Sequence, residues 1–245
     1  MLTFLKNHPF AVEAFFESSL VLTYALPVDV LRPLVPPQLE PDTFMDQAFL
    51  AVAIVQTRNL RPKGFPAFMG NDFVLTGYRI FVRYTNSDGR RLRGLYILRS
   101  ETDKKKMAVL GNIFTHYNYQ TTDIRVTEDG NTLQVLSKQS DLDISVNMAN
   151  PDAALPAGSP FASWKEARRF AGPLPFTFTC DPGSRKVLII EGVRENWTPH
   201  PVEVIGSKAG FLNRPEWKQA KLANAFIIRN IPYYWKKGKV DIWKQ

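Results

Sequence analysis

The stretch LTGYRIFVRYTNSDGRRLRGLYILR, residues 75–99, predicts a long β-hairpin. Two runs rich in aromatic and β-branched residues flank a turn that contains Asn86, Asp88 and Gly89. These are the residue types that tight turns between antiparallel strands favour. The hairpin therefore predicts a β-rich fold, which is our starting hypothesis for the whole chain.

Alternation along the first strand of this hairpin separates two sets of side chains. Arg79, Phe81 and Arg83 share one face, and Tyr78 and Tyr84 lie on the other, because successive side chains point to opposite sides of a strand. If the arginine face points into a hollow sheet, Arg79 and Arg83 could bind an anion. If that face points outward, the arginines are solubilising residues and Tyr78 is core packing or part of the pocket wall.

Other segments extend the β pattern on both sides of the hairpin. Ala48–Gln56 is a continuous apolar run of strand length, as in a strand that is covered on both faces. Asp129 and Gly130 lie between two alternating runs and predict a second tight hairpin. Further strands are expected at residues 20–24, 141–148, 175–181, 185–192, 201–206, 223–230 and 233–240, with a turn at Asp181–Ser184.

Short helices are expected at Val28–Leu34, in residues 107–117 and after Ser159, which we expect to cap its helix. Strands outnumber helices and no repeat is present. We therefore predict an α+β fold, mainly antiparallel β, with a few short helices and a sheet that closes or wraps into a β-barrel. The 245 residues, 44% of them hydrophobic, are expected to form a single domain over residues 1–245.

The composition indicates in which cellular compartment the protein is expected. Cys180 is the one cysteine, which rules out an internal disulfide and favours a cytoplasmic location. Lys6 and Glu13 interrupt the apolar N-terminal stretch, so we expect no signal peptide. No window approaches the roughly 18 uncharged apolar residues of a membrane helix, and we expect no membrane partner. The sequence leaves homo-oligomerisation open.

The net charge of +8 is concentrated in one part of the chain. Residues 58–106 contain twelve Lys or Arg against four Asp or Glu, which leaves nineteen against nineteen elsewhere. This segment favours an anionic partner. Nucleic acid is disfavoured because no RNA- or DNA-binding motif is present. No cofactor or metal is implied, since His8, His116 and His200 lie far apart and no glycine-rich phosphate loop occurs.

The segment RSETDKKKMAVLGN, residues 99–112, places three lysines between a strand and a helix. A lysine must lose its proton to attack a carbonyl, and its ordinary pKa of about 10.4 is lowered by neighbouring cations and by burial. Lys105 and Lys106 are therefore candidate nucleophiles, and Glu101 is a candidate proton shuttle. The alternative is a solvated basic turn in which Glu101 pairs with Arg99.

The segments LTYALPVDVLRPLVPPQLEPDTF, AGPLPFTF and LANAFIIRNIPYYWKKGK resemble the acetoacetate decarboxylase-like superfamily, and the last two resemble a family of unknown function within it. The resemblance implies a barrel around a pocket for a small anionic or carbonyl-bearing molecule. In the decarboxylase, an Arg-Glu pair precedes a Pro-Lys-Lys sequence whose first lysine forms a Schiff base. Carried onto this chain, the pattern gives Arg99 and Glu101 beside the pocket and Lys105 or Lys106 as nucleophile.

Two functions follow from this resemblance. The first is a Schiff-base lyase, either a decarboxylase or an aldolase-like enzyme, that acts on a small keto acid. The second is a non-catalytic barrel that binds a small molecule. Asp103 stands where the decarboxylase has the proline before its lysines, and Glu17 stands where it has an arginine ahead of its tyrosine, which favours the second.

Overall fold

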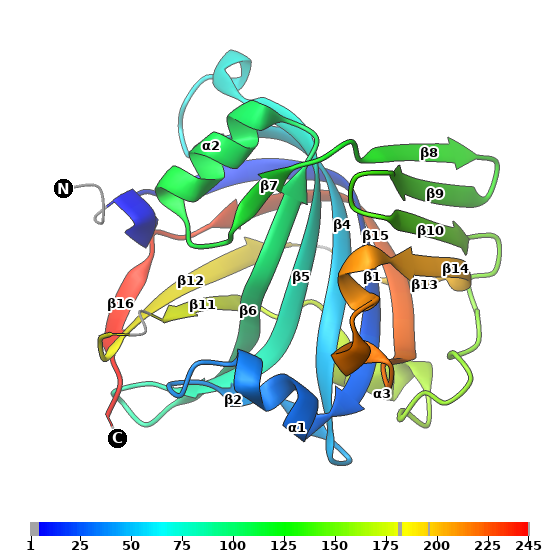
Figure 1. The fold of residues 1–245 in the computed structure, drawn as a ribbon. Coiled ribbons are helices and arrows are strands. Elements are labelled where there is room, and N and C mark those ends of the chain that lie inside the picture. Colours follow the sequence, from blue (N-terminus) through cyan, green and yellow to red (C-terminus); the bar gives the residue numbers. More distant parts are fainter. Residues whose placement is uncertain (1–4, 181–182, 196, 245) are drawn as a thin grey trace.

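The computed structural model describes residues 5–180, 183–195 and 197–244, and β-strands dominate them (Figure 1). Twelve strands form one large sheet, and four form a small sheet. Nearly all neighbouring strands are antiparallel; β11 and β7 both pair with β6 in the parallel sense. The expected mainly antiparallel α+β architecture is therefore confirmed.

The large sheet consists of β1 (Val12–Pro27), β2 (Glu40–Pro41), β3 (Thr43–Phe44), β4 (Gln47–Pro62), β5 (Asn71–Thr85), β6 (Arg91–Thr102), β7 (Tyr119–Thr121), β11 (Phe176–Cys180), β12 (Lys186–Arg194), β13 (His200–Pro201), β15 (Lys221–Trp235) and β16 (Lys239–Ile242). Its pairings run β15–β1–β4–β5–β6–β11–β12, and β12 also pairs with β15. The hydrogen-bonded order therefore returns to the strand from which it started.

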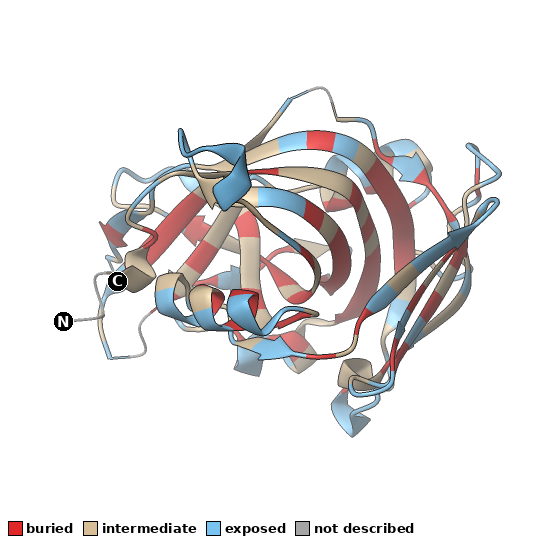
Figure 2. Ribbon diagram, turned by 90° about the horizontal axis from the view of Figure 1, so that it is seen from above, coloured by how far each residue is buried: buried red, intermediate tan, exposed pale blue. Residues whose placement is uncertain are grey.

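The small sheet is formed by β8 (Arg125–Asp129), β9 (Thr132–Ser137), β10 (Leu142–Asn147) and β14 (Glu203–Ala209). It lies beside the large sheet (Figures 1 and 2), and the main hydrophobic core fills the space between them. Val135 and Ile144 of the small sheet share this core with Leu50 and Ile80 of the large sheet. Both faces of β4 and β5 are therefore covered, as the apolar run Ala48–Gln56 predicted.

The hairpin of residues 75–99 forms as expected. β5 and β6 pair over their length, and Gly89 in the turn has a φ of 77°, which favours glycine. The register shifts between Tyr78 and Arg79. The second predicted hairpin is also present, with Gly130 between β8 and β9. The turn expected at Asp181–Ser184 lies partly outside the described residues.

Helices are short and cover the ends of the large sheet. They are α1 (Val28–Leu31), α2 (Lys105–Phe114) and α3 (Trp164–Ala171), with 3-10 turns at Leu5–Asn7, Arg32–Leu34, Ala67–Met69, Gly210–Leu212 and Pro215–Trp217. Within the described residues, no helix combines the length and the apolar character needed to cross a membrane.

The cap of α3 differs from the expectation. Ser163, not Ser159, is the N-cap, because its Oγ accepts a hydrogen bond of 3.2 Å from the Glu166 amide. The Glu166 carboxylate in turn accepts one of 2.7 Å from the amide of Ala162. Ser159 instead donates its hydroxyl to the carbonyl of Ala223. A serine followed three residues later by glutamate is the stronger start signal, since both side chains can satisfy free amides.

Candidate functional site: a cavity inside the large sheet

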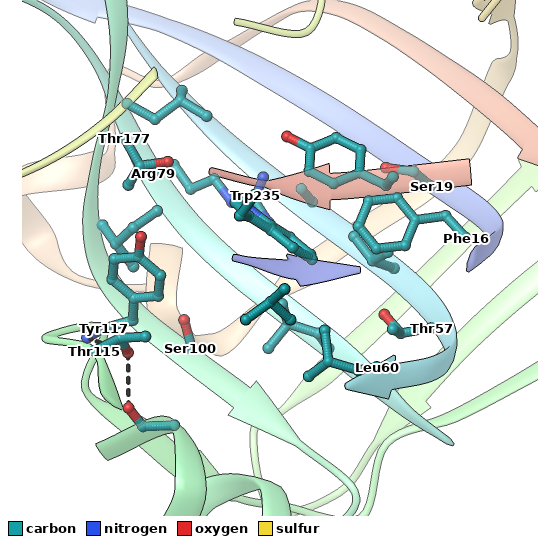
Figure 3. Close-up of a pocket in the computed structure, with 18 of the residues that line it drawn as sticks. Phe16, Ser19, Thr57, Leu60, Arg79, Ser100, Thr115, Tyr117, Thr177 and Trp235 are labelled. Atoms are coloured by element: carbon teal, nitrogen blue, oxygen red, sulfur yellow. Dashed lines mark hydrogen bonds between the residues drawn. The ribbon is translucent and has the colours of Figure 1, made fainter. Parts of the chain in front are cut away.

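The inner face of the large sheet lines a cavity of about 410 Å³ (Figure 3). β1, β4, β5, β6, β12 and β15 contribute to its walls, and α2 and the segment around Phe10 lie at one end. Phe10 is 36% exposed and packs against Phe114 of α2 with ring centroids 5.3 Å apart. This volume falls in the range of small-molecule sites in proteins.

Most of the cavity wall is apolar. The hydrophobic side chains come from strands far apart in the sequence that the closed order of pairings brings together. They include Phe16, Val21, Ala53, Val55, Phe73, Leu75, Phe81, Leu95, Ile97, Phe226, Ile228, Ile231 and Trp235. A ligand that fills this space must therefore present a largely apolar surface.

Arg79 is a cation in this apolar wall. It lies in the middle of β5, and Figure 3 shows its side chain at the cavity beside Thr177 and Tyr117. Its Nε is buried and has no hydrogen-bond partner. Among the described residues no carboxylate forms an ion pair with it, and the ionisable groups that act on it are tyrosines. Burial lowers the pKa of Arg79, yet an arginine keeps its proton in proteins.

Gly77 makes room for the Arg79 guanidinium. The two residues lie two positions apart on β5, and Gly77 is buried. A Cβ at Gly77 would lie 2.8 Å from Arg79 Nε and 3.1 Å from Nη2. The guanidinium therefore rests over the glycine, where any larger residue would push it away.

Three tyrosines surround Arg79 with neutral hydroxyl groups. Tyr117, Tyr119 and Tyr233 all line the cavity, and all three interact electrostatically with Arg79. Burial raises the pKa of Tyr119 to about 12 and also raises the pKa values of Tyr117 and Tyr233. These phenols stay protonated at neutral pH, so they can donate hydrogen bonds but cannot neutralise the arginine.

Arg194 is a second guanidinium in the cavity wall, and neutral groups hold it. Its Nη2 donates to the carbonyl oxygen of Pro173, and its Nη1 lies 3.5 Å from the Tyr233 hydroxyl. The guanidinium carbon also lies 5.3 Å from the centre of the Trp197 ring. These contacts fix Arg194 as part of the wall.

Tyr78, Arg99 and Glu101 come together, but away from the cavity. Arg99 Nη2 lies 2.6 Å from Glu101 Oε1, and the Tyr78 hydroxyl donates to Glu101 Oε2 at 3.3 Å. Tyr78 stacks on Phe211 at 4.2 Å under the small sheet. None of the three lines the cavity. Ser100 lies between Arg99 and Glu101 on β6, and because successive side chains point to opposite faces of a strand, Ser100 faces the cavity.

Arg83 lies on the Arg79 face, as alternation predicts, but at the end of β5. Its Nε pairs with Asp42, whose side chain is fully buried, and Arg93 pairs with the other oxygen of the same carboxylate. Arg83 also donates to the carbonyl of Thr43. Arg83 therefore neutralises the buried carboxylate of Asp42, and it does not line the cavity.

Lys104, Lys105 and Lys106 are all exposed, and none of them lines the cavity. Lys104 pairs with Asp103 at 3.3 Å, and α2 begins at Lys105. The buried side of α2 starts with Met107 and Ala108, which turns the preceding lysines to solvent. The structure thus does not place Lys105 or Lys106 away from water, which a Schiff-base role requires.

Sequence reasoning missed the tyrosines that accompany Arg79. Tyr117 and Tyr119 follow α2, and Tyr233 lies near the end of β15, far from Arg79 in the chain. One local signal was present: a glycine inside a strand, two positions before an arginine, indicates that another group comes close to the backbone. Gly77 and Arg79 fit that signal.

Comparisons with known proteins agree with this fold. Residues 14–229 match the family model DUF2071, described as "Uncharacterized conserved protein (COG2071)". The chain is 30% identical over 145 residues to the uncharacterized protein YqjF of Bacillus subtilis; the match covers 58% of this chain and 56% of YqjF, so it spans about half of that relative.

Solved structures with similar folds include two acetoacetate decarboxylase-type proteins. The acetoacetate decarboxylase of Legionella pneumophila has a TM-score of 0.62 at 12% identity, covering 95% of this chain and 88% of that one. An acetoacetate decarboxylase-like enzyme of Sphingomonas wittichii has a TM-score of 0.58 at 11% identity, covering 98% and 94%.

The enduracididine biosynthesis enzyme MppR, complexed with pyruvate, has a TM-score of 0.52 at 10% identity, covering 95% of this chain and 88% of that one. At these identities the likeness concerns the fold. The family match covers most of the chain. This protein therefore belongs to the uncharacterised family DUF2071, and its fold is like that of acetoacetate decarboxylase.

Proposed function

We propose that this protein binds a small anionic or carbonyl-bearing molecule inside the cavity without forming a covalent bond to it. In this proposal the ring of paired strands acts as a barrel around the ligand, and Arg79 supplies the charge that holds it. The observation that carries the proposal is the guanidinium of Arg79, which lines an apolar cavity and has no ion-pair partner among the described residues.

The physical argument rests on the cost of an isolated charge. A buried cation without an anionic partner is destabilising, and proteins keep such groups mainly where a ligand completes the pair. The tyrosine hydroxyls around Arg79 can donate to the free oxygens of a carboxylate or to a carbonyl. MppR, a structural neighbour, binds pyruvate, which supports a carboxylate or carbonyl group as the feature recognised.

A Schiff-base lyase remains the second function that the resemblance implies, and a trapping experiment separates the two. The protein would be incubated with a panel of keto acids and sodium borohydride, followed by mass spectrometry of the peptide that contains Lys104–Lys106. We expect no adduct, because the three lysines are exposed to solvent and lie outside the cavity. A reduced adduct on Lys105 or Lys106 would contradict the proposal of non-covalent binding and would support the Schiff-base lyase.

Gly77→Ala tests the position of the charge while leaving the charge itself in place. The new Cβ would displace the Arg79 guanidinium, so we expect carboxylate binding to weaken about tenfold, equivalent to roughly 1.4 kcal/mol. Isothermal titration calorimetry measures the change. Gly206→Ala is a matched control, because it also lies in a strand and a Cβ there meets nothing within 4 Å. Equal affinities in both variants would contradict the assigned position of Arg79.

A further inference from the structure

We infer that the ligand is an amphipathic monocarboxylate of about 10–14 non-hydrogen atoms, with its carboxylate at Arg79 and its apolar body along β4 and β5. This inference rests on the proposed function and adds the class of ligand. Medium-chain alkanoates such as decanoate represent the class. Pyruvate-sized keto acids fall outside it.

The size of the ligand follows from the cavity. Its volume of about 410 Å³ corresponds to roughly 14 groups the size of a water molecule, at about 30 Å³ each. A keto acid of six or seven non-hydrogen atoms would leave about half of that space unfilled, and empty space against an apolar wall forfeits the dispersion contacts of that wall. A longer molecule uses the whole cavity.

The apolar body of the ligand has a continuous track to follow from Arg79. Along β5 the inward positions after Gly77 are Leu75 and Phe73. The register of β4 places Ala53 opposite Gly77 and Val55 opposite Leu75. From Gly77 to Phe73 the strand extends about 13 Å. Between Gly77 and Phe73 the inward side chains of both strands are uncharged, so an alkyl chain can lie along them.

The charge of the ligand follows from the cations of the cavity. Arg79 has neither a carboxylate nor a carbonyl partner among the described residues, whereas Arg194 already donates to Pro173 and packs against Trp197. Arg61, the third arginine of the cavity wall, pairs with Glu13 and donates to the carbonyl oxygens of Phe65 and Asn59. Among the described residues of the wall, the guanidinium of Arg79 is therefore the one available to an anion. A second carboxylate at the far end of the ligand would lie against Leu75 and Phe73, where burial of a charge is unfavourable.

Calorimetric titration of the whole protein with straight-chain carboxylates from butanoate to tetradecanoate tests the inference. We expect affinity to rise about fourfold with each added methylene up to decanoate or dodecanoate, and to fall beyond that length. Decanol and decanedioate should both bind at least about tenfold more weakly than decanoate, because one lacks the anion and the other buries a second charge.

Two variants that fill the track make the test specific to the cavity. Ala53→Leu adds three carbon atoms beside Gly77, so the preferred ligand chain should become shorter by about three carbons. If Ala53→Leu does not fold, Ser19→Leu on the neighbouring strand β1 replaces it in the test. The loss of affinity should be larger for decanoate than for butanoate, because only the longer chain needs the whole track; an equal loss for both would contradict the placement of the chain along it.

The outcomes separate the inference from the function on which it rests. If pyruvate or acetoacetate binds as tightly as decanoate, the inference is wrong and the proposed function survives. Tighter binding of decanedioate than of decanoate would likewise contradict the inference that the ligand carries a single carboxylate. If neither the alkanoates nor the keto acids bind, the proposed function itself fails.

Discussion

Arg79→Met should make the ligand-free protein more stable and abolish its affinity for carboxylates. The methionine removes an unpaired charge from an apolar wall, so we expect a gain of about 1–2 kcal/mol in the free energy of unfolding. In a chain of this size that gain raises the Tm by roughly 2–8 °C. Carboxylate binding should weaken by about 100-fold or more, since the anion would be buried without a partner.

Differential scanning calorimetry and titration calorimetry on the same samples measure both effects. Arg90→Met is the matched control, because Arg90 is exposed in the turn of the same hairpin. Its stability and its carboxylate affinity should stay near those of the unmodified protein. Arg79 would not be the anion site if Arg79→Met retained full affinity, and loss of stability in that variant would show that the guanidinium has a structural partner.

Glu101→Ala should destabilise the protein by about 3–5 kcal/mol and leave carboxylate binding within about twofold of its original strength. Glu101 is 1% exposed and is the acceptor for both Arg99 and Tyr78. Its removal leaves the partly buried guanidinium of Arg99 without an anion and the Tyr78 hydroxyl without its acceptor. The cavity is spared because this cluster lies on the opposite face of the sheet from Arg79.

Chemical denaturation measures the loss of stability. Glu128→Ala is the control, since Glu128 pairs with Arg229 in solvent, and such exposed pairs contribute at most about 1 kcal/mol. The double variant Arg99→Met/Glu101→Met should recover much of the loss, because it removes both charges together. A Glu101→Gln variant of normal stability that no longer binds or turns over ligand would restore Glu101 to a functional role.

The elements that were predictable from sequence are those that local chemistry specifies. The turn at Asn86–Gly89 and the alternation of Arg79 and Phe81 follow from turn residues and from the strand period of two. The helix expected in residues 107–117 is present, but α2 begins two residues earlier, at Lys105, within the run of lysines. The resemblance to a family of unknown function, carried by residues spread over most of the chain, is confirmed by the family match, and the solved structures agree with the fold it implied.

The cavity was not predictable because both faces of β5 are buried. Tyr78 and Ile80 face the small sheet, and Arg79 and Phe81 face the cavity, so alternation alone cannot say which face encloses the site. The side chains that meet Arg79 lie in β15 and in the segment after α2, and only the tertiary structure brings them close. The lysines were ambiguous for a similar reason, since exposure at the first turn of α2 depends on what α2 packs against.

A crystal structure of the protein with bound decanoate tests the role of Arg79 most directly. The carboxylate is expected within about 3 Å of the Arg79 Nη atoms, with the alkyl chain between Val55 and Leu75 and no bond to any lysine. Electron density for the ligand outside the cavity, or continuous with Lys105 or Lys106, would contradict the placement of the binding site at Arg79.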